Sequence, residues 1–172
     1  MRKLFILILV FTLMLNGCTL SGCEDYYIET GIVGRETSEK LLGFLSDKDA
    51  DGLKSMFCPI ILSLDDIDEQ IQGALDFFEG EIISYDSIWG LKGGGSNRLV
   101  RENREITRFD ISPYLKNIET NAGRIYEIGY YSYVINSDYK NRIGVSEIFI
   151  RDEDGREFII GDYYLVNPHK QR

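Results

Sequence analysis

The sequence has few histidines and cysteines, and each shortage excludes a class of chemistry. Its single histidine, His169, lies close to the C-terminus, so a histidine–aspartate dyad in the folded part of the chain is excluded. Of the three cysteines, Cys18 and Cys23 lie in or beside an N-terminal leader, which leaves Cys58 as the one thiol of the domain. An internal disulfide framework is therefore not expected, and a cysteine nucleophile has no histidine partner. We expect Cys58 to be a buried structural thiol.

Positive charge is also scarce. The 172 residues include 19 Lys and Arg against 28 Asp and Glu. Residues 1–22 hold two of the bases and no acid, so the remainder has 17 bases and 28 acids, a net charge of −11. Proteins that bind nucleic acid carry a basic footprint, so no nucleic-acid partner is expected, nor is simple electrostatic docking on anionic lipid. The 44% hydrophobic content supports one domain with a core of its own.

The N-terminus carries the clearest motif. Arg2 and Lys3 precede an unbroken apolar run over residues 4–15, LFILILVFTLML. At about 1.5 Å per residue this run is too short to cross a bilayer of about 30 Å, and it fits the core of a signal peptide. Because no acid accompanies it, we predict that residues 1–22 form a signal peptide.

Two sequences after the apolar run, LNGC at 15–18 and LSGC at 20–23, resemble the bacterial lipobox, in which the cysteine becomes diacylated. The second matches at every position, whereas Asn16 is unusual in the first. We therefore predict a diacylglyceryl anchor on Cys23, with Cys18 as the alternative. This interpretation places the protein at the cell membrane on its extracytoplasmic side. A secreted protein without lipid, or a short membrane anchor, is the remaining interpretation.

Apolar spacing predicts helices in the first half of the chain. Leu41, Leu42 and Leu45 form the apolar face of one helix, and a short helix that Pro59 closes follows it. A central amphipathic helix is predicted from an N-cap at Ser63 to Phe78, with a stop at Gly80; apolar residues recur along it every three or four positions.

Strands are predicted in the second half, over residues 82–89, 99–110, 123–136, 143–151 and 156–166. The segment 114–121 is a loop or one helical turn, and Asp154-Gly155 is a two-residue hairpin turn. Helices followed by strands indicate an α+β fold, with N-terminal helices packed on one face of a curved antiparallel sheet of about five strands. The predicted division is a tether at 23–34, one domain at 35–167 and a disordered tail at 168–172.

Two short motifs resemble ligand loops but lack required parts. Asp47, Asp49, Asp51 and Gly52 match the opening of an EF-hand calcium loop, yet position 12 is Cys58 instead of a bidentate glutamate. We therefore predict a solvated turn in which an aspartate caps the second helix, and no metal or cofactor. The glycines at 93–95 follow a lysine and precede a strand, so a hairpin loop is predicted there in place of a phosphate cradle.

The aromatic strand at 123–136 offers the candidate binding site. Tyr131 and Tyr133 share one of its faces, and tyrosine hydroxyls buried against a concave sheet need partners. Glu147 and Asp162, on later strands, are candidate partners if they point inward. A carboxylate in an apolar pocket has a raised pKa and could act as a general base. The alternative interpretation is that the tyrosines pack in the core and the acids face solvent.

Trp89, at the end of the first predicted strand, completes the set of candidate binding residues. It either rims a pocket or a partner surface, or packs against the end of the strand.

Three stretches of the chain resemble the nuclear-transport-factor-two-like superfamily. They are a helix followed by an acidic break and a short helix at 49–57, the helix-to-strand junction at 78–86, and the last strand, which ends in GDYYLV at 161–166. That resemblance implies a cone-shaped α+β fold over about residues 35–167, with a curved sheet around a long helix. The superfamily includes ketosteroid isomerases, dehydratases, polyketide cyclases and non-catalytic binding or dimerisation modules. More narrowly, the chain resembles small bacterial lipoproteins whose domain has no assigned function.

Fold alone does not fix function. Because no catalytic constellation stands out, we predict a non-catalytic module of the cell envelope that binds a small ligand or forms a homodimer. One alternative is a small isomerase, dehydratase or cyclase with a carboxylate base and a tyrosine donor. Another is a structural partner in an envelope assembly.

Overall fold

The computed structural model describes residues 21–86, 96–102 and 105–169. The chain forms two compact units, Met1–Thr30 and Gly31–Arg172, and the whole sheet belongs to the second unit. Helix α2 (Ser21–Ser46) crosses the boundary between the units. The segment 23–34, expected to be a tether, is therefore helical. No proline interrupts α2, and the glycines inside it cost only about 1 kcal/mol each relative to alanine.

Three shorter helices follow α2 in the described chain: α3 (Ala50–Ser55), α4 (Pro59–Leu62) and α5 (Ile67–Phe77). The aspartate cap predicted for α3 is present, and the structure identifies it as Asp49, whose carboxylate accepts the N–H of Gly52 at 2.8 Å. The prediction that Pro59 closes a helix was wrong, because Pro59 begins α4, where its missing N–H is not needed.

The central helix α5 begins at Ile67, later than the predicted cap at Ser63. The Ser63 hydroxyl donates back to the Ile60 carbonyl at 2.6 Å, so it ends α4 instead of capping α5. Gly80, predicted as the stop, has φ +83 and turns the chain towards β1. A side chain there would meet Ala122 and Asn121 within 3 Å, so glycine is required.

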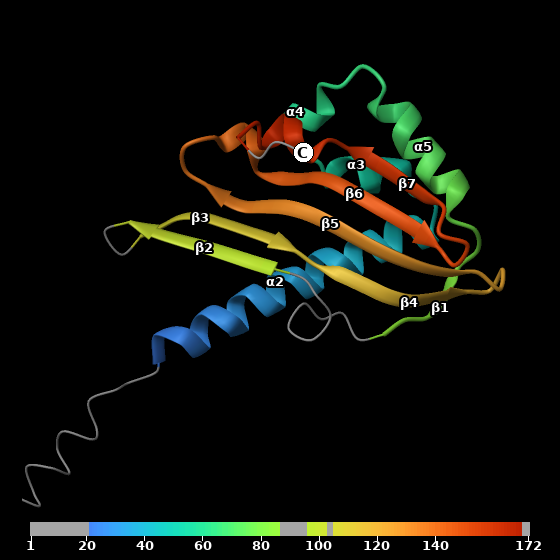
Figure 1. Ribbon diagram of the computed structural model, residues 1–172, viewed down its shortest axis with the longest axis horizontal. Coiled ribbons are helices and arrows are strands. Elements are labelled where there is room, and N and C mark those ends of the chain that lie inside the picture. Colours follow the sequence, from blue (N-terminus) through green and yellow to red (C-terminus); the bar gives the residue numbers. More distant parts are fainter. Residues whose placement is uncertain (1–20, 87–95, 103–104, 170–172) are drawn as a thin grey trace, which may run out of the picture. The chain divides into compact units, whose positions relative to one another are not determined.

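The described strands form one seven-stranded antiparallel sheet with β5 (Ile125–Asn136) at its centre. On one side of β5 lie β6 (Gly144–Asp152) and then β7 (Glu157–Gly161). On its other side β4 (Tyr114–Thr120) and β3 (Glu105–Ser112) follow one another along β5, as Figure 1 shows. The outer strands β1 (Ile82–Ser84) and β2 (Ser96–Glu102) pair with β4 and β3 respectively. The sheet is thus larger than the five strands predicted.

The prediction of a loop or helical turn over 114–121 was wrong, because this segment is β4. Its buried residues Leu115 and Ile118 are three positions apart, which imitates a helical turn. A bulge between them, with Asn117 at φ +51, adds the extra residue. Pro113 does not end the pairing between β3 and β5, because its carbonyl still accepts the N–H of Tyr130 at 3.3 Å.

The last predicted strand is also shorter than expected. The chain leaves β7 at Gly161 and forms a one-turn helix, α6 (Tyr163–Val166). Gly161 has φ +85, and the Asp162 carboxylate caps α6 by accepting the N–H groups of Tyr164 and Leu165 at 2.7 and 3.1 Å. A cap of this kind stabilises a helical start over a continued strand.

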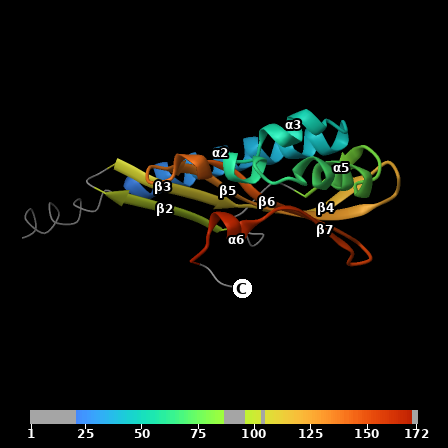
Figure 2. The same ribbon diagram turned by 90° about the horizontal axis from the view of Figure 1, so that it is seen from above.

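Within the second unit, α3, α5 and the part of α2 from Gly31 cover one face of the sheet, and α6 lies on the opposite face (Figure 2). The predicted leucine face of α2 is confirmed, because Leu41, Leu42 and Leu45 are all buried in the core. Helix α5 packs towards β7, where a side chain at Gly73 would meet the ring of Phe158 at 2.6 Å.

Tyr130 of β5 fastens α2 to the sheet. Its hydroxyl donates to the Gly34 carbonyl at 3.1 Å and shares a hydrogen bond of 3.1 Å with Ser38. Burial raises the pKa of Tyr130 to about 12, from an ordinary value of 10.0. The ionised form is thus disfavoured in the folded state more than in the unfolded chain.

We expect this raised pKa to make stability fall at high pH. The stabilisation is intact below pH 10, where both states are neutral, and about 2 to 3 kcal/mol of it is lost as the pH rises towards 12. Tyr130→Phe should be about 1 kcal/mol less stable than wild type at pH 8, because it loses the hydrogen bonds. Urea unfolding from pH 8 to pH 12 should show this difference shrinking and then changing sign, so that the variant becomes the more stable protein near pH 12; a constant difference would contradict the assignment.

Candidate functional site

Consecutive tyrosines of β5 point to opposite faces of the sheet. Tyr130 contacts α2 on the covered face, whereas Tyr131 contacts Tyr163 of α6 on the other, with ring centroids 4.6 Å apart. The tyrosines named from the sequence, Tyr131 and Tyr133, therefore lie together, with ring centroids 5.5 Å apart, and both contact the C-terminal segment at or just after α6.

A buried polar network surrounds these two tyrosines. The Tyr131 hydroxyl donates to Asp110 at 2.8 Å, and Arg108 pairs with the same carboxylate at 3.1 Å. The hydroxyl of Tyr133 bonds to Asn167, just after α6, and receives a bond from Arg108. Burial, followed by the bond to Asp110, raises the pKa of Tyr131 far above its ordinary value, so this hydroxyl stays protonated and donates. The network fastens the C-terminal segment to the sheet.

The two carboxylates named from the sequence serve the same segment. Glu147 of β6 accepts the N–H of Tyr163 at 3.1 Å, and Asp162 caps α6. Both acids thus hold the chain where it leaves β7.

The remaining predicted residues fall outside what the structure describes in atomic detail. Trp89 and Cys18 lie outside the described residues, as do the glycines at 93–95, and Cys23 is described only as part of the backbone of α2. The binding role of Trp89 and the lipid on Cys23 therefore stay predictions. None of the described helices is both long and apolar enough to cross a membrane.

A cavity of about 430 Å³ lies on the covered face, between α2, the end of α3 and the strands β5 and β6. Its size falls in the range of sites for small molecules. Its lining comes from one stripe of α2, from the α3–α4 junction, and from residues 132–134 and 143–145: Val33, Thr37, Lys40, Phe44, Ser55, Met56, Ser132, Tyr133, Val134, Ile143, Gly144 and Val145. Tyr133 is the one residue named from the sequence that also lines it.

Two β-bulges shape the sheet at this cavity. Phe109 pairs with Ile135 and Asp110 with Tyr133, which leaves Val134 as an extra residue of β5 in the cavity lining. In β6 the residue left out of the pairing is Ser146, directly after the lining residue Val145. Bulges bend a strand and re-aim its side chains, and they are common beside binding sites.

The sequence analysis missed this cavity, although α2 carried a signal for it. The lining residues Val33, Thr37, Lys40 and Phe44 recur at intervals of four, three and four, so they share one stripe of the helix. That stripe lies beside the buried leucine stripe, and its threonine and lysine distinguish it from a core face. The bulges leave no comparable pattern in the sequence.

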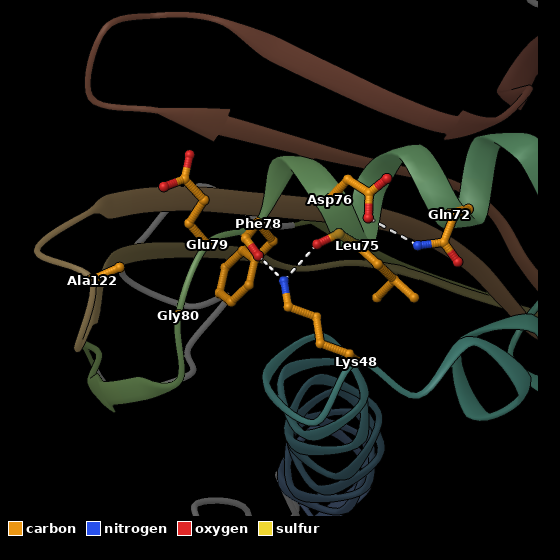
Figure 3. Close-up of a pocket in the computed structure, with 8 residues that line it drawn as sticks. All are labelled: Lys48, Gln72, Leu75, Asp76, Phe78, Glu79, Gly80 and Ala122. Carbon is orange, nitrogen blue, oxygen red and sulfur yellow. Dashed lines mark hydrogen bonds between the residues drawn. The ribbon is translucent and has the colours of Figure 1, made fainter.

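A second cavity, of about 530 Å³, lies beside the C-terminus of α5 and contains Lys48 (Figure 3). The Lys48 ammonium donates to the carbonyls of Leu75 and Phe78, which have no partner further along the helix. Burial lowers the pKa of Lys48, and the nearby carboxylates of Asp76 and Glu79 oppose that shift. The lysine thus acts as a C-terminal cap for α5, and its donors are used within the fold.

In the described part of the chain, His, Cys, Asp and Glu form no group of three or more that could hold a metal ion. Burial raises the pKa of the Cys58 thiol, which disfavours its reactive thiolate.

The fold and the cavity define the class of this protein as an α+β domain, with helices over one face of an open antiparallel sheet and a small-molecule-sized cavity between them. The chain belongs to the family described as a domain of unknown function (DUF5104), whose model matches residues 40–153. No curated protein matches the chain.

The role of Lys48 can be tested through stability. Lys48 has φ +56, a conformation that costs a non-glycine residue about 1 kcal/mol or more. We expect Lys48→Ala to lower the free energy of unfolding by about 1 to 2 kcal/mol, because the carbonyls of Leu75 and Phe78 lose their donor. Lys48→Gly should lose about 1 kcal/mol less, since glycine relieves the backbone. Urea unfolding measures both, and two variants as stable as wild type would contradict the cap.

Proposed function

We propose that this protein is a lipid-anchored lipoprotein of the bacterial cell envelope that binds a small ligand in the cavity between α2 and the bulged strands β5 and β6. The anchor is proposed from the signal-peptide pattern and from LSGC, which ends at Cys23. Ligand binding is proposed from the cavity. Membership of the nuclear-transport-factor-two-like superfamily is part of the same proposal, supported by helices that cover one face of an antiparallel sheet.

The observation that carries the binding role is the combination of volume and lining. The 430 Å³ cavity has mainly apolar walls with a few hydroxyls and one charged side chain, as is usual in small-molecule sites. Most of its lining lies within residues 40–153, the region that the family model matches. The network that holds α6 also lies partly within this region, and only its C-terminal members, such as Asp162 and Asn167, lie outside it. The cavity is the better candidate for binding because it offers space for a ligand.

The polar residues of the cavity and of its surroundings favour ligand binding over catalysis. None of the described residues that line the cavity is acidic or a histidine, so none can serve as the carboxylate or imidazole base that the isomerase or dehydratase alternative needs. The acids considered for that role, Glu147 and Asp162, hold backbone N–H groups instead.

A homodimer or envelope partner would use the opposite face of the sheet. There the ring of Phe149 lies over Gly129 and its centroid is 5.6 Å from that of Tyr114, while Ile159 of β7 is exposed. Among the described helices, α6 is the one on this face. Aromatic and aliphatic side chains of this kind are enriched at interfaces. Because the two faces are separate, variants of the cavity leave this second candidate intact.

Lipidation is tested by growing the expressing cells with an alkyne analogue of palmitate and detecting label on the protein. We expect wild type and Cys18→Ser to be labelled and Cys23→Ser to carry no label, because only a diacylated cysteine at 23 incorporates the analogue. Loss of label in Cys18→Ser alone would move the anchor to Cys18. An unlabelled wild-type protein would rule out the anchor.

Ligand binding is tested on the full chain in phosphatidylcholine vesicles with a photoreactive, uncharged probe, a decanol that carries a diazirine. We expect probe insertion into residues 132–134 and 143–145, mapped by mass spectrometry. Val33→Trp should fill the cavity and reduce this labelling about tenfold, because Val33 is a lining residue of α2. Its neighbour Ile32 is 41% exposed and lies outside the lining, so Ile32→Trp is the matched control and should label like wild type. Equal labelling of both variants would refute the cavity as the site.

A further inference from the structure

We infer that the natural ligand of the cavity is an anionic amphiphile, an alkyl chain that ends in a carboxylate, whose head group pairs with Lys40. This inference rests on the proposed ligand-binding function and adds the charge and the polarity pattern of the ligand. It is carried by the charges of the lining, by the order of its polar and apolar residues, and by the free ammonium of Lys40.

The charge of the lining is opposite to that of the chain as a whole. The sequence has a formal net charge of −9, yet Lys40 is the one charged residue among the described lining residues. No ion pair of Lys40 occurs in the part of the chain that the structure describes, although Glu36 stands one helical turn before it. A cleft whose only charge is positive raises the local concentration of anions and disfavours cations.

The position of Lys40 suits a head group at the entrance. Lys40, Ser55 and Ile143 are exposed, so they mark the mouth of the cavity. Val145 and Tyr133 are 1% exposed and form its floor. A carboxylate beside Lys40 would keep part of its hydration while its ammonium contact adds a charge-assisted hydrogen bond. A charge at the floor would lose its hydration without a cation to replace it.

The walls behind Lys40 match an alkyl body. Phe44, Met56 and Val134 are half-buried lining residues, less exposed than Lys40 and more exposed than Val145. Methionine adapts to flexible apolar chains, since its thioether side chain is unbranched and polarizable. A polar ligand such as a sugar would leave its hydroxyls against these walls without hydrogen bonds, which costs free energy for each of them.

The hydroxyls of Thr37 and Ser55 are bonded within the fold, so Lys40 supplies the contact to the head group. The side chain of Thr37, three residues before Lys40 on the same stripe of α2, bonds to Tyr130. The Ser55 hydroxyl, at the end of α3, donates to the Gly52 carbonyl at 2.6 Å. Arg142, directly before Ile143, adds a second cation near the mouth; its guanidinium stacks on Tyr139 at 4.0 Å.

The experiment uses the full chain in phosphatidylcholine vesicles and three diazirine probes of equal length: a decanoate, a decanol and a decylamine. We expect the decanoate to label residues 132–134 and 143–145 more strongly than the decanol, and the decylamine to label them least. Lys40→Met should reduce labelling by the decanoate roughly three- to fivefold, the range for an exposed ion pair, and leave the decanol unchanged. Lys40→Arg should keep the preference.

Lys116→Met is the matched control, because it removes the same charge from an exposed lysine of β4 outside the cavity lining. It should label like wild type with all three probes. Equal labelling of the cavity by decanoate and decanol, unchanged in Lys40→Met, would overturn the anionic preference while the ligand-binding function stands. If none of the probes labels the cavity, both proposals fail. A general loss with Lys116→Met would show that net charge, and not the Lys40 contact, governs the uptake.

Discussion

The packing of α2 on β5 is the interaction on which the second unit depends. The buried leucines at 41, 42 and 45 supply the apolar area, and Tyr130 fixes the helix in position through Ser38 and the Gly34 carbonyl. A buried tyrosine hydroxyl without partners would cost about 1 to 3 kcal/mol, so these bonds restrict where α2 can lie. The contact of Tyr130 with α2 also determines which stripe of the helix faces β5 and β6 at the cavity.

The cavity follows from this placement together with the bulges of the sheet. With the leucine stripe packed, the neighbouring stripe from Val33 to Phe44 faces β5 where Val134 is displaced from its pairing. Gly144 allows β6 to approach the α3–α4 junction, since its φ is +120 and a side chain would meet the backbone of Cys58 at 2.8 Å. A regular pair of strands would bring larger side chains to that junction and close the space.

The sequence predicted the parts of the fold that depend on local, regular patterns. The leucine face of α2, an aspartate cap on α3 and the α+β order are present, because spacing and cap chemistry act over a few residues. A hairpin is also present around Asp154-Gly155, but its connection is longer than the two residues predicted, since β6 ends at Asp152 and β7 begins at Glu157. The errors occur where an irregularity changes the period. Asn117 adds a residue to β4, so Leu115 and Ile118 imitated a helical turn. Strand β7 ends at Gly161, and Asp162 caps α6 directly after it. Such positions are set by tertiary contacts, which periodicity does not encode.

The candidate site was also predicted only in part from the sequence. Alternation correctly placed Tyr131 and Tyr133 on one face of β5, but it could not say which face meets the helices. The tyrosine hydroxyls found partners on the far face, where Asp110 and Asn167 are available, and Tyr130 took the covered face. The tyrosine-rich sequence of β5 therefore predicted the residues that hold the C-terminal segment against the sheet, and not a ligand site. The sequence signal for the cavity is instead a threonine and a lysine on a stripe of α2 that is otherwise apolar. Polar residues at the edge of an apolar helix face distinguish a helix that lines a cavity from one that only packs in the core.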